Sequence, residues 1–177
     1  RDQIEETDPE LEYRQTEYSL LGNGNKAIHS GGSSRTLSPM ECGISLARII
    51  HNDLVEADCS GWQWWTTFEK DASSGNEERF ALIRYILNNQ QTDGVYRPTK
   101  LLYALGNFSR FIRPGMKRVD VMRLDGLSAA DAIANQMVSA YIDEINHELV
   151  IVVINASTQS RSIRMNISGL SNNMGIT

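Results

Sequence analysis

The stretch LEYRQTEYSLL at residues 11–21 has the pattern of a β-strand, in which Tyr13, Gln15 and Glu17 alternate with Arg14, Thr16 and Tyr18. A segment rich in Gly, Ser and Asn follows at residues 22–37 and predicts a loop. Residues 38–56, SPMECGISLARIIHNDLVE, predict a helix, and residues 58–68, DCSGWQWWTTF, predict a second strand rich in aromatic residues. This alternation of strand and helix is typical of the α/β class.

The helix expected at residues 38–56 has a well-defined beginning. Ser38 can cap the helix, Pro39 suits the first helical position, and Glu41 can reach back to the amide of the cap. The apolar positions that we expect on its buried face are Met40, Ile44, Ala47, Ile50 and Leu54.

Residues 79–87, RFALIRYIL, fit a strand or a helix by pattern alone. The turn sequence Thr92-Asp-Gly94 that follows favours a strand. A second helix is expected from Pro98 or Thr99, ended by Pro114-Gly115. Its apolar positions in register are Leu101, Leu105, Phe108 and Ile112.

Beyond residue 115 the sequence predicts strands only, so an α/β part gives way to an antiparallel β part. The expected strands are 118–122, 137–143, 148–155 and 161–167. The last has the clearest alternation, and we expect Ile163, Met165 and Ile167 to be buried while Arg164 is exposed.

Composition and charge exclude several classes of protein. The chain has 177 residues, of which 41% are hydrophobic and 22% charged, as in globular proteins. Six acidic residues against Arg1 alone give residues 1–12 the whole net charge of −5, so the rest of the chain is neutral and favours neither nucleic acid nor an acidic membrane as partner. No apolar run approaches the roughly 20 residues of a membrane span, and the first residues lack a signal-peptide pattern.

The two cysteines, Cys42 and Cys59, are expected to be buried thiols. Neither they nor His29, His51 and His147 have the spacing of a metal site, so no metal is predicted. No nucleotide-binding fingerprint is present, and no cofactor is predicted.

Glu17 and the run Trp62-Gln-Trp-Trp65 are the candidates for chemistry. Glu17 ends a strand before a Gly-rich loop, where a carboxylate can act as nucleophile or general acid/base, or can simply be a solvated glutamate. In a strand, Trp62 and Trp64 share one face and Trp65 takes the other. Because indole rings both fill cores and stack on sugar rings, we expect at least one in the core and one lining a pocket.

Several segments together resemble the C-terminal half of glycoside hydrolase family 30, over about residues 11–170. The likeness is to the branch that includes endo-β-1,6-galactanases. The segments, in chain order, are Gln15-Thr-Glu-Tyr18, Gly43–Asp58, Trp62-Gln-Trp-Trp65 and the run TKLLYALGNFSRFIRPG at Thr99–Gly115.

This resemblance implies the C-terminal part of a (β/α)8 catalytic barrel for residues 1–114, followed by an incomplete antiparallel β-sandwich domain at 115–177. Residues 11–17 and 58–66 would be barrel strands seven and eight, and the helix at 98–112 would close the barrel. A secreted or periplasmic location is also implied.

The resemblance further implies a retaining O-glycosyl hydrolase that acts on β-linked polysaccharide, with β-1,6-galactan as one possible substrate. Glu17 would be the nucleophile, Trp62 would form the floor of the subsite for the attacked sugar, and Trp64 and Tyr18 would also bind substrate. The acid/base would lie on a strand outside these residues. The chain would therefore need the N-terminal part of the barrel and would be inactive alone.

Two other interpretations remain open. The chain could be part of a non-catalytic carbohydrate-binding protein that uses the tryptophan run for stacking on sugars. It could also be an inactive fragment. Glu17 and Trp62 at the same end of adjacent parallel strands would favour the enzyme.

Overall fold

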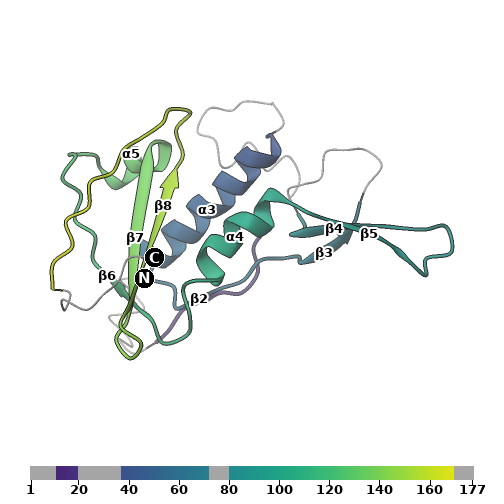
Figure 1. The fold of residues 1–177 in the computed structure, drawn as a ribbon, viewed down its shortest axis with the longest axis horizontal. Helices are drawn as coiled ribbons and strands as arrows, with labels where there is room; N and C mark the ends of the chain where they lie inside the picture. Colours follow the sequence, from purple (N-terminus) through teal and green to yellow (C-terminus); the bar gives the residue numbers. More distant parts are fainter. Residues whose placement is uncertain (1–10, 20–36, 72–79, 170–177) are drawn as a thin grey trace. The chain divides into compact units, whose positions relative to one another are not determined.

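The computed structural model describes residues 11–19, 37–71 and 80–169 (Figure 1). It is a mixed α/β fold that divides into two compact units, Arg1–Gly106 and Asn107–Thr177. The expected domain boundary between residues 114 and 115 stays a prediction. The acidic residues 1–10 and nearly all of the expected Gly-rich loop lie outside the described residues.

The first unit contains a parallel pair of short strands, β1 (Arg14–Gln15) and β2 (Gly61–Trp62). Arg14 lies opposite Gly61 and Gln15 opposite Trp62. Backbone hydrogen bonds continue the pairing on both sides, from Ser60 N–H to the Tyr13 carbonyl and from Trp65 N–H to the Tyr18 carbonyl, each 2.9 Å. The two segments expected as adjacent strands are thus parallel neighbours, but regular ladder geometry covers only two residues of each.

Helix α3 (Pro39–Val55) begins as the sequence predicts. The Ser38 hydroxyl accepts a hydrogen bond from Glu41 N–H at 3.3 Å, and the Glu41 carboxylate accepts one from Ser38 N–H at 2.8 Å. Both halves of a capping box are therefore present. Its buried face is centred on Leu46 and Ile50, which are 0% and 1% exposed.

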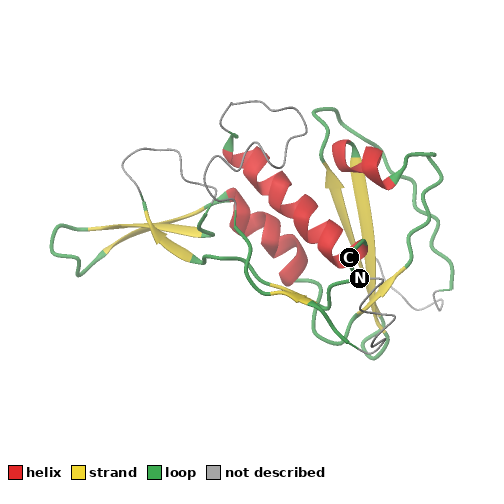
Figure 2. Ribbon diagram, turned by 180° about the vertical axis from the view of Figure 1, so that it is seen from behind, coloured by secondary structure: helices red, strands yellow, loops and turns green. Residues whose placement is uncertain are grey.

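The expectation that Met40 is buried was wrong, since 56% of its surface is exposed. Met40 lies in the first turn, and the buried stripe of α3 runs instead through Gly43. A Cβ atom at Gly43 would lie 3.0 Å from the carbonyl oxygen of Lys100, the first residue of helix α4 (Lys100–Ser109). The small residue thus lets the two helices approach, and they lie side by side in both views (Figures 1 and 2).

A three-stranded sheet joins the tryptophan run to α4. Strand β3 (Phe68–Lys70) pairs in parallel with β4 (Ile83–Leu87), which pairs antiparallel with β5 (Gly94–Pro98). Strand β4 confirms the strand preferred at residues 79–87, and the turn at 92–94 connects it to β5. At Gly94 a Cβ atom would collide with the carbonyl of Ile86, so the turn requires glycine there.

The second helix predicted from the sequence is present as α4, but it ends at Ser109, before the proline and glycine at residues 114 and 115. Thr99, which directly precedes it, donates its hydroxyl to the carbonyls of Ala81 and Leu82 at 2.9 and 3.0 Å. These contacts hold the end of β5 against the residues that directly precede β4.

The second unit is an antiparallel sheet in the order β6-β7-β8. Strand β6 (Lys117–Val119) is followed by helix α5 (Ala129–Ala134), β7 (Gln136–Asp143) and β8 (Glu148–Asn155). The long hairpin of β7 and β8 is visible in Figure 2 and confirms the strands expected there. Its inward side chains include Met137, Tyr141 and Ile154, each at most 5% exposed.

Two expectations for this unit were wrong. Helix α5 interrupts the region expected to hold strands only; Ser128 caps it by accepting a hydrogen bond from Asp131 N–H at 3.1 Å. Residues 161–167 form no strand, and Met165 and Ile167 are 43% and 49% exposed. An extended segment is stabilised by a neighbouring strand, and the described residues place none beside this one.

Within the described ranges, no helix is long and apolar enough to cross a membrane. Cys42 and Cys59 form no disulfide. Cys42 is buried as expected, whereas Cys59 is half-buried.

Candidate functional site

Glu17 lies two residues beyond the carboxyl end of β1, and its side chain is exposed. In a parallel pair the carboxyl ends of both strands meet at one edge, so Glu17 and the residues that follow Trp62 share that edge. The backbone carbonyl of Glu17 accepts a hydrogen bond of 2.9 Å from the side-chain amide of Gln15. The carboxylate is thus presented to solvent from an anchored backbone.

The segment around Glu17 contains one residue more than its partner. Gln63 N–H donates to the Gln15 carbonyl and Trp65 N–H to the Tyr18 carbonyl, at 2.8 and 2.9 Å. Between these two bonds the chain advances by two residues from Gln63 to Trp65 but by three from Gln15 to Tyr18. One extra residue on one strand is what defines a β-bulge. Bulges commonly re-aim a side chain near active sites.

The bulge changes which residue packs on the tryptophans. Simple alternation would put Glu17 on the same face as Gln15, which lies opposite Trp62, and Tyr18 on the other face. Instead the ring of Tyr18 lies 6.4 Å from that of Trp62 and 6.2 Å from that of Trp64, measured between centroids. Trp62 and Trp64 stack on each other at 6.1 Å with an interplanar angle of 19°. We call Tyr18, Trp62 and Trp64 the aromatic cluster.

Both indole N–H groups of the aromatic cluster already have protein acceptors. Trp62 Nε1 donates to the Asp53 carboxylate on α3 at 2.6 Å, and Trp64 Nε1 donates to the Phe80 carbonyl at 2.6 Å. Trp62 and Trp64 are half-buried. They can therefore offer a sugar their ring faces but no indole hydrogen bond, and both also contribute to packing.

Trp65 is the most accessible ring of the tryptophan run, with 47% of its surface exposed. The backbone N–H of Trp65 donates to the Tyr18 carbonyl, so Trp65 lies directly beside the segment that contains Glu17. The peptide bond between Trp65 and Thr66 is cis. Our sequence interpretation did not choose Trp65 as a site residue, although the alternation in the run already separated it from Trp62 and Trp64.

Asp53 was also missed, because nothing in a helical pattern marks one aspartate as the acceptor of a distant indole. It influences a second group, Cys59. Burial, with the charges of Asp53 and Asp58 adding to it, raises the pKa of the Cys59 thiol above its ordinary value. The shift disfavours the thiolate, which is the nucleophilic form of a cysteine.

Among the residues that the structure describes, no group of three or more His, Cys, Asp or Glu side chains could hold a metal ion. The groups described at this edge are the Glu17 carboxylate and the rings of Tyr18 and the tryptophan run. A carboxylate can attack an electrophilic carbon or move a proton, and the rings can hold an apolar sugar face.

Residues 1–75, which include Glu17 and the tryptophan run, match the family model described as O-Glycosyl hydrolase family 30. The chain resembles glycoside hydrolase family 30. In sequence it is 30% identical over 114 residues to the glucuronoxylanase XynC of Bacillus subtilis (strain 168), an alignment that covers 64% of this chain and 21% of that enzyme.

Solved structures extend the family 30 likeness to the fold. The crystal structure of a conserved exported protein from Bacteroides fragilis matches 94% of this chain and 33% of its own length, with a TM-score of 0.77 and 30% identity. The catalytic domain of GH30 xylanase C from Talaromyces cellulolyticus matches 82% of this chain and 28% of its own length, with a TM-score of 0.55 and 24% identity.

These relatives are much longer than the present chain. It spans about a fifth of the glucuronoxylanase and about a third of the exported protein. The family match and the xylanase relatives support a glycosidase at the general level.

Proposed function

We propose that this chain is part of a retaining glycoside hydrolase of family 30 that acts on β-linked polysaccharide. Glu17 is the nucleophile in this proposal. The observation that carries it is the exposed carboxylate at the carboxyl edge of the parallel pair β1 and β2, in the segment that pairs with the tryptophan run. Catalytic groups of α/β barrels stand at that edge of the strands.

The proposed reaction has two steps. In the first, the Glu17 carboxylate attacks the anomeric carbon, and the bond to the leaving sugar breaks as a second carboxylic acid protonates the glycosidic oxygen. In the second, that carboxylate takes a proton from water, the water attacks the same carbon, and Glu17 is released. The two carboxyl groups of such enzymes lie about 5–5.5 Å apart. In this proposal the second carboxyl comes from outside these 177 residues, as does the remainder of the barrel.

Aromatic rings at the same edge would bind the sugar. Trp62, Trp64 and Tyr18 form one wall, and Trp65 adds the most exposed ring face of the tryptophan run. Stacking on indole and phenol rings suits the apolar faces of sugars in β-linked chains. Xylan, on which the named relatives act, and β-1,6-galactan are the two polymers to test first.

The test compares wild-type full-length protein with Glu17→Gln on xylan, glucuronoxylan and β-1,6-galactan, following new reducing ends. We expect wild type to cleave one polymer and Glu17→Gln to be slower by at least about 1,000-fold, because the amide cannot form the glycosyl ester. The matched control is Glu12→Gln, an exposed carboxylate of the same segment. It should retain the wild-type rate.

Two further readouts test the assigned role. The first product of wild type, observed by NMR, should keep the anomeric configuration of the substrate. Azide should restore turnover of an activated glycoside by Glu17→Ala, because the small anion can occupy the vacated position. Full activity of Glu17→Gln, or an inverted product, contradicts the proposal. Binding of a polymer without cleavage by wild type would favour the non-catalytic carbohydrate-binding alternative.

A further inference from the structure

The sheet of β3, β4 and β5 exposes large apolar side chains on both faces. Ile86 and Val95, 52% and 64% exposed, lie on the face of Arg84, and a larger set lies on the other face. The strand register puts Phe68, Ile83 and Pro98 in one row and Lys70, Tyr85 and Tyr96 in the next. Phe68 is 61% and Tyr96 is 77% exposed. We call this surface the tyrosine face; it also includes Leu87.

The opposite face of the sheet near its base carries charges that bind one another. The guanidinium of Arg84, 1% exposed, lies 2.8 Å from the Glu69 carboxylate and 3.4 Å from that of Asp71. Arg97 lies 3.7 Å from the same Asp71 oxygen. These ion pairs connect neighbouring strands and so stabilise the sheet. In the two rows of the tyrosine face named above, Lys70 is the one charged side chain.

The tyrosine face belongs to a sheet that continues from the candidate site. Trp64 of the aromatic cluster donates its indole N–H to Phe80, and Thr66 N–H also donates to the Phe80 carbonyl at 3.2 Å. Leu82 N–H returns a bond to the Thr66 carbonyl at 3.1 Å. Backbone bonds thus connect the residues beside Glu17 to the strand that carries Tyr85.

We propose that the tyrosine face binds a β-linked polysaccharide chain beyond the sugar that Glu17 attacks. This inference rests on the proposed function. It deepens that function because an enzyme that also binds sugars away from the cleaved bond would cleave within a polymer chain. Phenol rings offer a stacking surface together with a hydroxyl, and a weakly charged face suits a neutral glycan. A peptide added as a strand would instead use backbone groups at the sheet edge.

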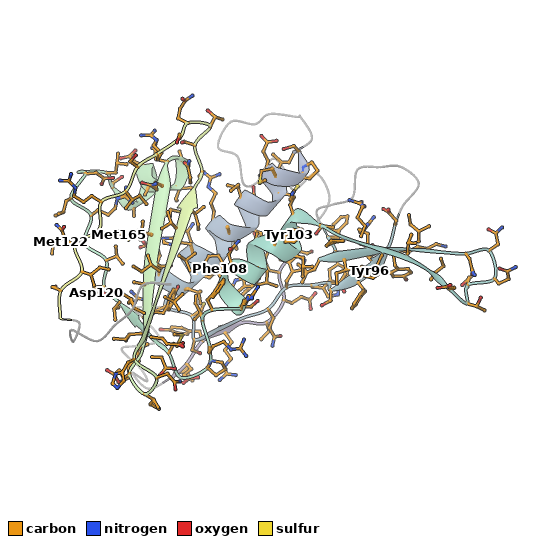
Figure 3. All side chains as sticks on the ribbon, in the orientation of Figure 1. Tyr96, Tyr103, Phe108, Asp120, Met122 and Met165 are labelled. Atoms are coloured by element: carbon orange, nitrogen blue, oxygen red, sulfur yellow. The ribbon has the colours of Figure 1, made fainter. Side chains whose placement is uncertain are left out.

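Tyr96 is the ring to change, and Tyr103 is its matched control. Both are exposed tyrosines of the first unit, but Tyr103 is 56% exposed on α4 whereas Tyr96 lies on β5 (Figure 3). Full-length Tyr96→Ala, Tyr96→Phe and Tyr103→Ala proteins are compared on the polymer that wild type cleaves and on a short aryl glycoside of the same sugar.

We expect Tyr96→Ala to lower kcat/KM on the polymer about tenfold, as for the loss of one stacking contact, and to leave kcat/KM on the aryl glycoside unchanged. Tyr96→Phe keeps the ring and should keep most of the rate, and Tyr103→Ala should match wild type. An unchanged rate of Tyr96→Ala on the polymer overturns the inference. Equal losses on both substrates, or a lower Tm, mean a structural role and overturn it too.

Binding separates this inference from the proposed function. Affinity electrophoresis in gels that contain each polysaccharide requires no catalysis, so it is carried out in the Glu17→Gln background. Retardation that Tyr96→Ala abolishes and Tyr103→Ala keeps supports the tyrosine face even if Glu17 proves not to be the nucleophile. No retardation by any polymer, or a dimer in analytical ultracentrifugation that Tyr96→Ala dissolves, overturns it.

Discussion

Trp62 is anchored by the 2.6 Å hydrogen bond from its indole to Asp53. Replacing it with phenylalanine keeps an aromatic ring but leaves the half-buried carboxylate without this donor. We expect Trp62→Phe to lower the free energy of unfolding by about 1.5–3 kcal/mol, because hydrogen bonds to charged groups are worth roughly that much. Urea titration followed by circular dichroism measures the change.

The control for this prediction is Trp65→Phe. Trp65 is about half exposed, so the same substitution there should change stability by no more than about 0.5 kcal/mol. Similar values for the two variants would mean that the bond to Asp53 contributes nothing beyond ring packing.

Cys59 offers a pH-dependent prediction. Burial, and then the negative charges of Asp53 and Asp58, raise the pKa of its thiol. Neutralising Asp58 removes one charge that opposes the thiolate, so the pKa falls and more thiolate is present at any given pH. Asp58→Asn is a mild change, since residue 58 has φ of 55° and asparagine tolerates that conformation.

The rate of alkylation by iodoacetamide, measured against pH, checks this. In Asp58→Asn the rise of the rate should move to lower pH than in wild type, whereas Asp93→Asn, in the turn between β4 and β5 of the same unit, should leave it unchanged. Cys42 is buried and should contribute little to the measured rate. A shift to higher pH would show that Asp58 stabilises the thiolate.

Among the secondary-structure elements, helix α3 depends on Ser38 for its beginning. Its hydroxyl satisfies the Glu41 N–H, one of the amides that a helix leaves without an internal partner. We expect Ser38→Ala to lower the free energy of unfolding by about 1 kcal/mol and Ser38→Thr to recover most of that loss. Urea titration again gives the values, and equal stability of wild type and Ser38→Ala would show that the cap is energetically neutral.

The elements that the sequence predicts best are those with local signals. The beginning of α3 follows from three residues, and the hairpin of β7 and β8 follows from two long alternating runs. Helix α5 was missed because six residues carry too little periodicity. Residues 161–167 have a strand pattern, but a pattern states which side chains would share a face and cannot supply the neighbouring strand.

The neighbourhood of Glu17 and the tryptophan run was predictable from the sequence, but its geometry only in part. The order of Glu17 and the tryptophan run along the chain indicated adjacent parallel strands, and these are present. The contact of Tyr18 with Trp62 and Trp64 was not predictable from alternation, because it depends on a bulge that leaves no mark in the sequence. Partners such as Asp53 come from packing between elements distant in sequence.

Considered as a whole, the chain shows how a fold can be recognised in a part. The match to the exported protein covers 94% of these residues but 33% of that structure. The likeness therefore extends over nearly all of this chain, including both of its compact units. Apolar side chains such as Met165 and Ile167 show which predictions a part of this length leaves without a neighbour.

The β-bulge between Gln15 and Tyr18 has a consequence for mutations that change the length of this segment. Because side chains alternate along a strand, the side that Glu17 faces depends on how many residues precede it since Gln15, not on which residues they are. A single-codon deletion at Thr16 would remove the extra residue: Tyr18 would stay on the side of Trp62 and Trp64, and Glu17 would lose the bulge that now presents it. Insertions and deletions, more than substitutions, are thus the changes to which this edge of the molecule is sensitive.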